Sequence, residues 1–462
     1  MNGAWNRKSA LLVVALGYFL VTFTISSVNV ALPSIGKEFA LDAVSLSWVV
    51  ATYLLTSVMF LLPFGKLADT GGRKKIFVYG ALLFALASFF SGIANVAVVL
   101  ICFRALQGIG CGMILATGIA ILTSVFPIGE RGTVFGINTA SVYLGYSVGP
   151  FLGGFLTQNL GWRSIFFVGL LVALTTFALG FWKIATEKVD VKKERFDFVG
   201  SSVYGVTLLL VIYGFSSLPA TSGALLIMAG IFGFLIFIQW EKRTKNPILR
   251  LEIFSKNLPF KLSNIAALIN YSATFPVSFL LSLYLQHVRG FSSQNAGIIL
   301  LAQPIMQAIF SPISGKLSDR IEPRIVSSAG MAVTAVGLFL FAILDVNTAL
   351  WFIEFSLVLI GFGFALFAAP NTNAVMSSVK QRFYGIASAT LSTMRQTGQV
   401  LSMGVVTLIF SIYIGRVQIT PEYYPQLLSS TRVAFEIFGA LCSLGVLASF
   451  FRGRVRTLSS AR

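Results

Sequence analysis

Residues 65–75 read Gly-Lys-Leu-Ala-Asp-Thr-Gly-Gly-Arg-Lys-Lys, and residues 315–320 repeat the beginning of this run as Gly-Lys-Leu-Ser-Asp-Arg. Each copy follows a long apolar segment, and the two copies begin 250 residues apart, at Gly65 and Gly315. In a chain of 462 residues, this offset indicates two halves with the same order of elements. The repeat therefore predicts two similar bundles with the same orientation.

The composition excludes most classes of soluble protein. Apolar residues make up 56% of the chain and charged residues only 11%, whereas soluble domains have about 25% charged residues. So few charges cannot cover a water-facing surface, which excludes a soluble enzyme, a disordered protein and a disulfide-rich secreted domain. His287 is the single histidine, and the three cysteines lie inside apolar runs. We therefore predict no metal site and no cofactor.

Apolar segments long enough to cross a bilayer, about 20 residues each, recur along the whole chain. They lie approximately at residues 9–34, 44–63, 76–95, 98–123, 133–158, 164–184, 197–216, 223–240, 261–286, 294–314, 325–345, 348–376, 384–413 and 433–452. The loops between them are too short for a soluble domain. The sequence thus predicts an all-α, multi-pass membrane protein with about 14 transmembrane helices, and the even number places both termini on one side.

The basic residues predict the orientation of these spans. If the N-terminus is cytoplasmic, 27 of the 34 Lys and Arg residues lie in cytoplasmic segments and five in outer segments. Arg104 and Arg395 remain within spans. This asymmetry follows the positive-inside rule, and it explains the net charge of +18 without a nucleic-acid partner. We expect a protein of the plasma (inner) membrane with both termini in the cytoplasm.

The repeat and the spans together predict three parts of the chain. Residues 1–190 form an N-terminal six-helix bundle, and residues 259–462 form a C-terminal one. Residues 191–258 contribute two linker transmembrane helices and a cytoplasmic loop. Parallel repeats of this kind are typical of one large transporter architecture, in which the substrate site lies between the halves.

Several further motifs accompany the quoted run. They are Arg104 to Gly110 in span 4, the glycines and Pro150 of span 5, Val28 to Pro33, and Trp48 to Tyr53. Over essentially the whole chain, these motifs resemble the major facilitator superfamily, and within it the fourteen-span drug:proton antiporter family. The resemblance implies a multidrug exporter that works by alternating access, without a cofactor, as a monomer in the bilayer.

Both copies of the quoted run are candidates for a gate at the cytoplasmic ends of the helices. The gating candidates are Gly65, Asp69 and Arg73 in the first copy and Gly315, Asp319 and Arg320 in the second. A carboxylate there can face the N-terminus of a neighbouring helix, and that contact can break when the halves rock. The alternative is a tight charged loop that only follows the positive-inside bias.

Span 5 carries glycines at a spacing that brings helices close together. Gly145, Gly149, Pro150 and Gly153 reproduce the antiporter motif of the family, which marks exporters rather than importers. The structural alternative is close helix packing through Gly-x-x-x-Gly steps, with a bend at Pro150. Both interpretations can hold together, because a closely packed, kinked helix can also seal the central site from the outside.

A proton-coupled antiporter needs a titratable group within its spans. The family usually places an Asp in span 1 where this chain has Thr24, so the coupling residue departs from the family pattern. Glu354 and Glu436 are the acids that remain within spans. We predict that Glu354 carries the proton after burial raises its pKa, with Glu436 as the shallower candidate. Arg104, in the resembled span 4 motif, would tune a neighbouring carboxylate.

Polar residues within the spans are candidates for the wall of the substrate cavity. They are Thr24, Asn29, Gln107, Gln303, Gln307, Asn371, Arg395 and Gln396. The alternative for each is a hydrogen bond that joins two helices. With few intramembrane acids and two arginines, the cavity favours neutral, zwitterionic or anionic compounds over dications.

The sequence predicts a proton-coupled secondary active exporter of small amphipathic compounds or drugs. Its partners would be the small-molecule substrate, protons and the lipid bilayer. One alternative keeps the fold but exports a specific metabolite, lipid or siderophore. Another is an uncoupled facilitator, which the substitution at Thr24 favours and the span 5 motif disfavours. An enzyme is not expected, because no cluster of acids, His or Cys has catalytic spacing.

Overall fold

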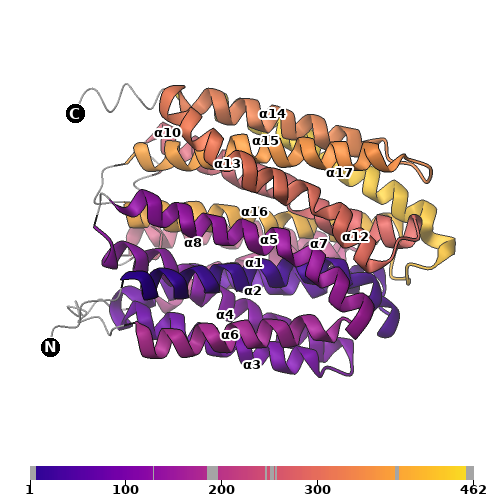
Figure 1. Ribbon diagram of the computed structural model, residues 1–462, viewed down its shortest axis with the longest axis horizontal. Helices are drawn as coiled ribbons and strands as arrows, with labels where there is room; N and C mark the ends of the chain where they lie inside the picture. The colour runs from indigo at the N-terminus through magenta and orange to yellow at the C-terminus, as the bar shows by residue number, and fades with distance from the viewer. Residues whose placement is uncertain are drawn as a thin grey trace.

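The computed structural model describes residues 7–127, 130–184, 196–244, 247–249, 254, 257–379 and 384–453, and these are helical almost throughout (Figure 1). The first six long helices are α1 (Arg7–Glu38), α2 (Ala43–Gly71), α3 (Arg73–Gly92), α4 (Ala97–Val125), α5 (Arg131–Leu160) and α6 (Arg163–Lys183). A hairpin of α7 (Phe198–Ser217) and α8 (Thr221–Arg243) follows. The second half comprises α10 (Leu258–Thr274), α11 (Pro276–Leu283), η2 (Tyr284–Val288), α12 (Ser293–Leu300), α13 (Ala302–Arg320), α14 (Pro323–Ala342), α15 (Leu350–Ser377), α16 (Tyr384–Tyr413), η4 (Pro421–Tyr423) and α17 (Tyr424–Phe450).

Thirteen helical segments among the described residues are long and apolar enough to cross a membrane. The fourteenth expected span is α5, whose 30 residues give a length of about 45 Å. Its many glycines and polar residues make it less apolar than the others. The predicted fold class, an all-α multi-pass membrane protein of about fourteen helices, is confirmed.

Two spans of the second half are broken. The span from Leu258 to Val288 consists of α10, α11 and the π-helical η2, and Pro276 opens α11. The next span consists of α12 and α13, which meet at Leu301. Because α11 packs against α1 and α12 packs against α5, both broken spans contact the first half.

Local chemistry explains where several helices begin. Asp42 starts α2 by accepting a hydrogen bond from the backbone N–H of Ser45 at 2.8 Å, and Asn257 caps α10 by accepting from the N–H of Phe260 at 3.0 Å. Gly72 separates α2 from α3 with a φ of +99°, a conformation that favours glycine. The run quoted from the sequence therefore comprises the end of α2, a tight turn at Gly72 and the start of α3.

The helices pack as two groups of six (Figure 1). In the first bundle, α1 packs against α4, α5 and α6, and α4 packs against α2 and α3. In the second bundle, α10 packs against α15, α16 and α17, and α15 packs against α13 and α14. The predicted domain boundary at residues 190–191 lies outside the described residues.

The α7–α8 hairpin lies over one of the two seams between the bundles. The seam is formed by α2 and α16, and α7 packs against both. Trp48 of α2 faces Tyr213 of α7 with their rings 6.1 Å apart, and Ser411 of α16 donates a hydrogen bond to the carbonyl of Leu218 at 2.6 Å. The other seam joins α5 to α12 and α13.

The first turn of α1 and the last turn of α17 lie at the same end of the molecule (Figure 1). We call this end the terminal side and the other end the opposite side. Large apolar side chains are exposed along most helices, as in Trp182 of α6 and Trp351 of α15. Such a surface suits contact with lipid rather than with water.

Candidate functional site

Helix α5 presents two faces of small residues to two different neighbours. Toward α1, a Cβ atom on Gly149 would lie 2.9 Å from the Cβ of Ser26, and one on Gly153 would lie 2.7 Å from the Cα of Ser27. Ser27 donates a hydrogen bond to the carbonyl of Gly149 at 2.9 Å. Gly145 also packs on α1, where its added Cβ would lie 2.8 Å from the Phe19 carbonyl oxygen. This face holds the first bundle together.

The other face of α5 meets the second bundle at backbone contact. A Cβ atom on Gly297 of α12 would overlap the carbonyl oxygen of Pro150, and one on Gly154 would overlap that of Ser293. Such contact requires glycine on one side of each pair, because any side chain would push the two bundles apart. The span 5 motif therefore combines packing within one bundle with a close contact between bundles.

Hydrogen bonds cross between the bundles near the same side. Gln286 of η2 donates to the carbonyl of Val30 in α1 at 2.8 Å. The hydroxyls of Ser47 in α2 and Thr407 in α16 lie 2.7 Å apart. The two bundles are thus joined at the opposite side by hydrogen bonds between α1 and η2 and between α2 and α16.

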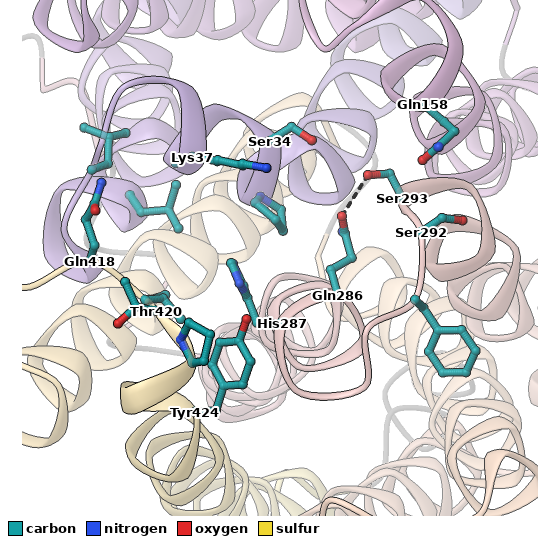
Figure 2. Close-up of a pocket in the computed structure, with 17 residues that line it drawn as sticks. Ser34, Lys37, Gln158, Gln286, His287, Ser292, Ser293, Gln418, Thr420 and Tyr424 are labelled. Carbon is teal, nitrogen blue, oxygen red and sulfur yellow. Dashed lines mark hydrogen bonds between the residues drawn. The ribbon is translucent and has the colours of Figure 1, made fainter.

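A cavity of about 490 Å³ opens on the opposite side between the two bundles (Figure 2). Its first-bundle wall includes Lys37 of α1 and Gln158 of α5, and its second-bundle wall includes His287 and Tyr424. The rings of His287 and Tyr424 lie 5.9 Å apart, and Ser293 donates to Gln286 at its edge. The lining is mixed: Leu41, Leu46, Phe291 and Ile419 are apolar, and hydroxyl and amide groups lie around one lysine and one histidine.

The predicted gating residues lie on the terminal side. Arg73 begins α3, and its Nη1 donates to the carbonyl of Ala120 in α4 at 3.4 Å. A Cβ atom added to Gly65 would have no neighbouring atom within 4 Å, and one added to Gly315 would lie 3.8 Å from the Cβ of Ala369. Arg320 is exposed at the end of α13. The side chains of Asp69 and Asp319 lie outside the described residues. The gating role of both motifs stays a prediction.

Arg104 is fully buried inside the first bundle. Its Nε donates to the carbonyl of Val49 at 3.0 Å, and its Nη1 donates to Oε1 of Gln107. The guanidinium lies 4.3 Å from the centre of the Tyr53 ring. Gln107 in turn donates to the hydroxyl of Ser88 at 2.7 Å. Arg104 is therefore bound by α2 and its own helix, while its Nη2 is buried without a hydrogen-bond partner.

The surroundings of Arg104 are electrically neutral. Thr24 is buried in α1 and donates to the carbonyl of Leu20 at 2.8 Å. Its hydroxyl and that of Ser88 flank Gly169, whose added Cβ would lie 3.6 Å and 3.7 Å from them. No acidic side chain that the structure describes forms an ion pair with Arg104. Threonine and glutamine thus fill the place where a carboxylate could have met the arginine.

Arg395 on α16 is only half-buried. Its Nη2 donates to the hydroxyl of Thr372 in α15 at 2.6 Å, and its guanidinium lies 5.2 Å from the centre of the Tyr271 ring. Its Nε is buried without a hydrogen-bond partner. Within the described residues, no carboxylate forms an ion pair with it.

Tyrosines from both bundles lie at a depth similar to that of Arg395. Tyr18 of α1, Tyr143 and Tyr146 of α5, Tyr271 of α10 and Arg395 all lie roughly 16–23 Å from the terminal-side ends of their helices. Of these tyrosines, Tyr271 faces the Arg395 guanidinium, with its ring centre 5.2 Å away. We call these four tyrosines the tyrosine layer.

Further contacts connect the tyrosine layer to the second bundle. Gln399 of α16 donates to the Tyr146 hydroxyl at 3.4 Å. Phe364 and Ala368 of α15 pack with Tyr143 and Tyr271, and the rings of Tyr271 and Phe364 meet edge to face at 5.1 Å. A cation, amide groups and aromatic rings thus meet between the bundles, about halfway along the helices.

Of the two acids predicted to couple protons, Glu354 lies near the opposite-side end of its helix and Glu436 lies about 18 Å from the start of α17. Glu354 is in the second turn of α15 and is exposed. Glu436 is also exposed, one turn beyond Arg432, which donates to the carbonyl of Leu344 just past α14. The expected burial of Glu354 is not observed. Whether either acid carries a proton stays a prediction.

The other predicted cavity residues lie in separate places. Asn371 is bound at the terminal side, where it accepts from Arg452 at 2.6 Å and donates to the carbonyl of Ser263 at 3.1 Å. Burial lowers the pKa of Arg452 to about 9. The remaining four are Asn29, Gln307 and Gln396, which are buried, and Gln303, which is half-buried. Of the eight predicted cavity residues, Arg395 is the one with direct contact to the tyrosine layer.

The sequence prediction overlooked the tyrosine layer. Its members lie in the middle of apolar spans among 43 phenylalanines, so hydropathy does not distinguish them. The available signal was the hydroxyl group itself, because a tyrosine in the middle of a span needs a polar partner or water. Among the described residues, no three His, Cys, Asp or Glu side chains come together as a metal site requires.

A model of the Major Facilitator Superfamily matches residues 14–240 and 263–461. A solved structure of the human organic anion transporter MFSD10 (TETRAN) superposes with a TM-score of 0.67, covering 96% of this chain and 99% of the other. Its sequence identity is 14%, so this likeness concerns the fold alone.

Two curated relatives align over most of the chain. The riboflavin transporter RibZ of Clostridioides difficile is 27% identical over 441 residues, which cover 96% of each chain. The multidrug resistance protein Stp of Mycobacterium tuberculosis is 31% identical over 417 residues, which cover 88% of this chain and 77% of that one. The names of these relatives agree on transport or resistance and differ in the compounds concerned.

Proposed function

The chain belongs to the Major Facilitator Superfamily, whose members are membrane transporters of small molecules rather than enzymes, and we propose that it is a proton-coupled exporter of small amphipathic compounds. We place it in the fourteen-span drug:proton antiporter type, with the terminal side in the cytoplasm. The resistance protein among its relatives supports an exporter, and the distribution of basic residues supports this orientation.

The contact between α5 and α12 carries the proposal. Pro150 and Gly154 touch Gly297 and Ser293 at backbone distance on the opposite side. A seam without interlocking side chains can close tightly and can separate as a unit when the bundles rock. Arg395 and the tyrosine layer lie deeper, so opening this seam would expose them to the outside. Alternating access requires this arrangement.

For the proton carrier we propose Glu354, with Glu436 as the second candidate. Both are exposed, and Glu354 lies near the opposite side, where protons would arrive from outside. Arg104 has neutral partners within the described residues, so its predicted influence on a carboxylate would have to act over a distance. Protons entering from the opposite side would favour the state that releases substrate outward.

The test is transport by the full chain in proteoliposomes with an imposed pH gradient. We expect the gradient to drive the movement of a neutral dye, and Glu354→Gln to reduce that movement about tenfold or more. Glu422→Gln is the matched control, because Glu422 is also an exposed acid of the opposite side. If gradient-driven transport survives in both Glu354→Gln and Glu436→Gln, neither glutamate is the proton carrier. If the dye moves at the same rate with and without the pH gradient, the protein is an uncoupled facilitator.

A specific metabolite is the second candidate for the cargo. The relative that aligns over 96% of both chains is named a riboflavin transporter, which favours one defined compound. A panel of chemically unrelated dyes and metabolites separates the two. Movement of several unrelated compounds supports a multidrug exporter, whereas movement of a single compound supports the metabolite exporter.

A further inference from the structure

We propose that the space around Arg395 binds organic anions that carry a planar aromatic ring, with the guanidinium holding the anionic group and the tyrosine layer holding the ring. This substrate class rests on the proposed function, because a site between two bundles serves transport when the bundles alternate around it. The charge of the site, its free donor and its aromatic wall carry the inference.

Arg395 brings a permanent positive charge to the middle of the helices, because a guanidinium is not deprotonated in proteins. An arginine at such depth needs a compensating partner or water. Its partners are the Thr372 hydroxyl and the Tyr271 ring, and no described carboxylate forms an ion pair with it. An anionic substrate would supply the missing counter-charge, whereas a cation would be repelled.

The guanidinium also has a donor to spare. Its Nη2 is already bonded to Thr372, but its Nε is buried without a partner. A buried donor left unpaired is costly. The N–H groups of a guanidinium form a planar fork that matches two oxygens of one acid group. A carboxylate, sulfonate or phosphate oxygen that accepts from Nε would satisfy this donor.

The walls around Arg395 favour a planar ring. Tyr143 and Tyr146 come from the first bundle, and Tyr271 and Phe364 come from the second. Tyr271 already stands edge to face with Phe364 at 5.1 Å, and Tyr143 packs beside both. Aromatic pairs at such distances gain stability beyond their buried area. The hydroxyls also offer hydrogen bonds to polar substituents on the ring.

The test is equilibrium binding of three matched probes to the purified full chain in lipid nanodiscs, measured by calorimetry. The probes are 2-naphthoate, its neutral amide 2-naphthamide and the cation 2-naphthylmethylammonium. We expect naphthoate to bind about tenfold more tightly than the amide, and the cation to bind most weakly. Equal affinities for naphthoate and the amide would overturn the proposal.

Two variants of the site separate charge from ring recognition. Arg395→Gln should weaken naphthoate binding about tenfold or more and change the amide about twofold at most. Tyr271→Leu should weaken naphthoate and the amide equally. If Arg395→Gln does not fold, Arg395→Lys replaces it as the test, because lysine keeps the positive charge and lacks the planar pair of N–H donors. An unchanged preference for naphthoate over the amide in Arg395→Lys would contradict the proposed role of those two donors. Preference retained in a folded Arg395→Gln would overturn the proposal outright.

Arg416→Gln is the matched control, because Arg416 is exposed after α16 and its loss changes the net charge by the same amount. We expect it to keep the preference for naphthoate. The outcome also separates this inference from the proposed function. If a pH gradient drives neutral dyes but naphthoate is not preferred, the inference fails and the exporter stands. If naphthoate binds through Arg395 but no compound responds to a gradient, the exporter fails.

Discussion

Arg104 in the first bundle and Arg395 in the second lie within the predicted spans, and the two arginines are bound in different ways. Arg104 is fully buried, with hydrogen bonds to Val49 and Gln107, a stack on Tyr53 and an Nη2 that has no hydrogen-bond partner. Arg395 is half-buried, with one hydrogen bond and a free Nε. Both arginines leave one donor unpaired, so they differ in burial and in the number of hydrogen bonds. An intramembrane charge alone therefore does not mark a binding site, because a ligand must also be able to reach it.

The largest difference between the two arginines should appear when each is replaced by lysine. Arg104→Lys removes the planar fork that reaches two acceptors and the Tyr53 ring, so we expect a loss of roughly 2–4 kcal/mol in stability. Arg395→Lys should cost less than about 1 kcal/mol, because its surroundings admit water or substrate. Chemical unfolding in detergent, followed by tryptophan fluorescence, measures both. Similar losses would break the comparison.

The seam between α5 and α12 offers a second test of the comparison. When the bundles separate there, the surroundings of Arg395 should change, whereas those of Arg104, inside the first bundle, should not. Gly297→Val places a side chain against the Pro150 carbonyl, and we expect it to destabilise the closed seam by roughly 1–3 kcal/mol. A cysteine introduced at Gln158, in a Cys102→Ser background, should then react faster with a water-soluble maleimide. Gly136→Val is the control, because Gly136 has open space around it. Unchanged labelling would argue against a closed seam.

Gln107→Leu tests how firmly Arg104 is bound. The change leaves Nη1 of Arg104 and the hydroxyl of Ser88 without their partner, and we expect a loss of about 1–2 kcal/mol. In the Arg104→Lys background, the same change should cost at least about 0.5 kcal/mol less, because the two residues act together. A double-mutant cycle by chemical unfolding measures this coupling, and strict additivity would show that the hydrogen bond contributes nothing.

The smallest expected effect concerns the partner of Arg395. Thr372→Val removes the hydroxyl that accepts from Nη2 and should change stability by less than about 1 kcal/mol, since the site is partly exposed. With the guanidinium less fixed, we expect a rise of about two- to fivefold in the KM for an aromatic anion. Thr372→Ser keeps the hydroxyl and should restore the KM. If Thr372→Val lost as much stability as Arg104→Lys, Arg395 would be a structural residue like Arg104.

Hydropathy predicted the helices well, because crossing a bilayer imposes about 20 apolar residues wherever a helix passes. It was least informative for α5, whose glycines pack on α1 and α12 and need little hydropathy. It also placed the start of the last span at residue 433, whereas α17 begins at Tyr424. Polar residues beyond the membrane can continue a helix, and hydropathy does not register them.

The polar site was predicted less completely than the helices. Arg395 was identified because charge within a span is costly, but its tyrosine neighbours come from α1, α5 and α10. Contacts between residues so far apart depend on how whole bundles meet, and no local pattern encodes that. Asn371 shows the same limit, since its partner Arg452 follows α17 and secures the terminal side rather than a cavity.

The hairpin of α7 and α8 makes the two seams unequal toward the surrounding lipid. Because α7 packs on both α2 and α16, it screens that seam from molecules that diffuse within the bilayer. Neither α7 nor α8 packs against α5, α12 or α13 among the described contacts. A hydrophobic compound dissolved in a leaflet would therefore meet the seam of α5 with α12 and α13 directly, but would meet the seam of α2 with α16 only behind the hairpin.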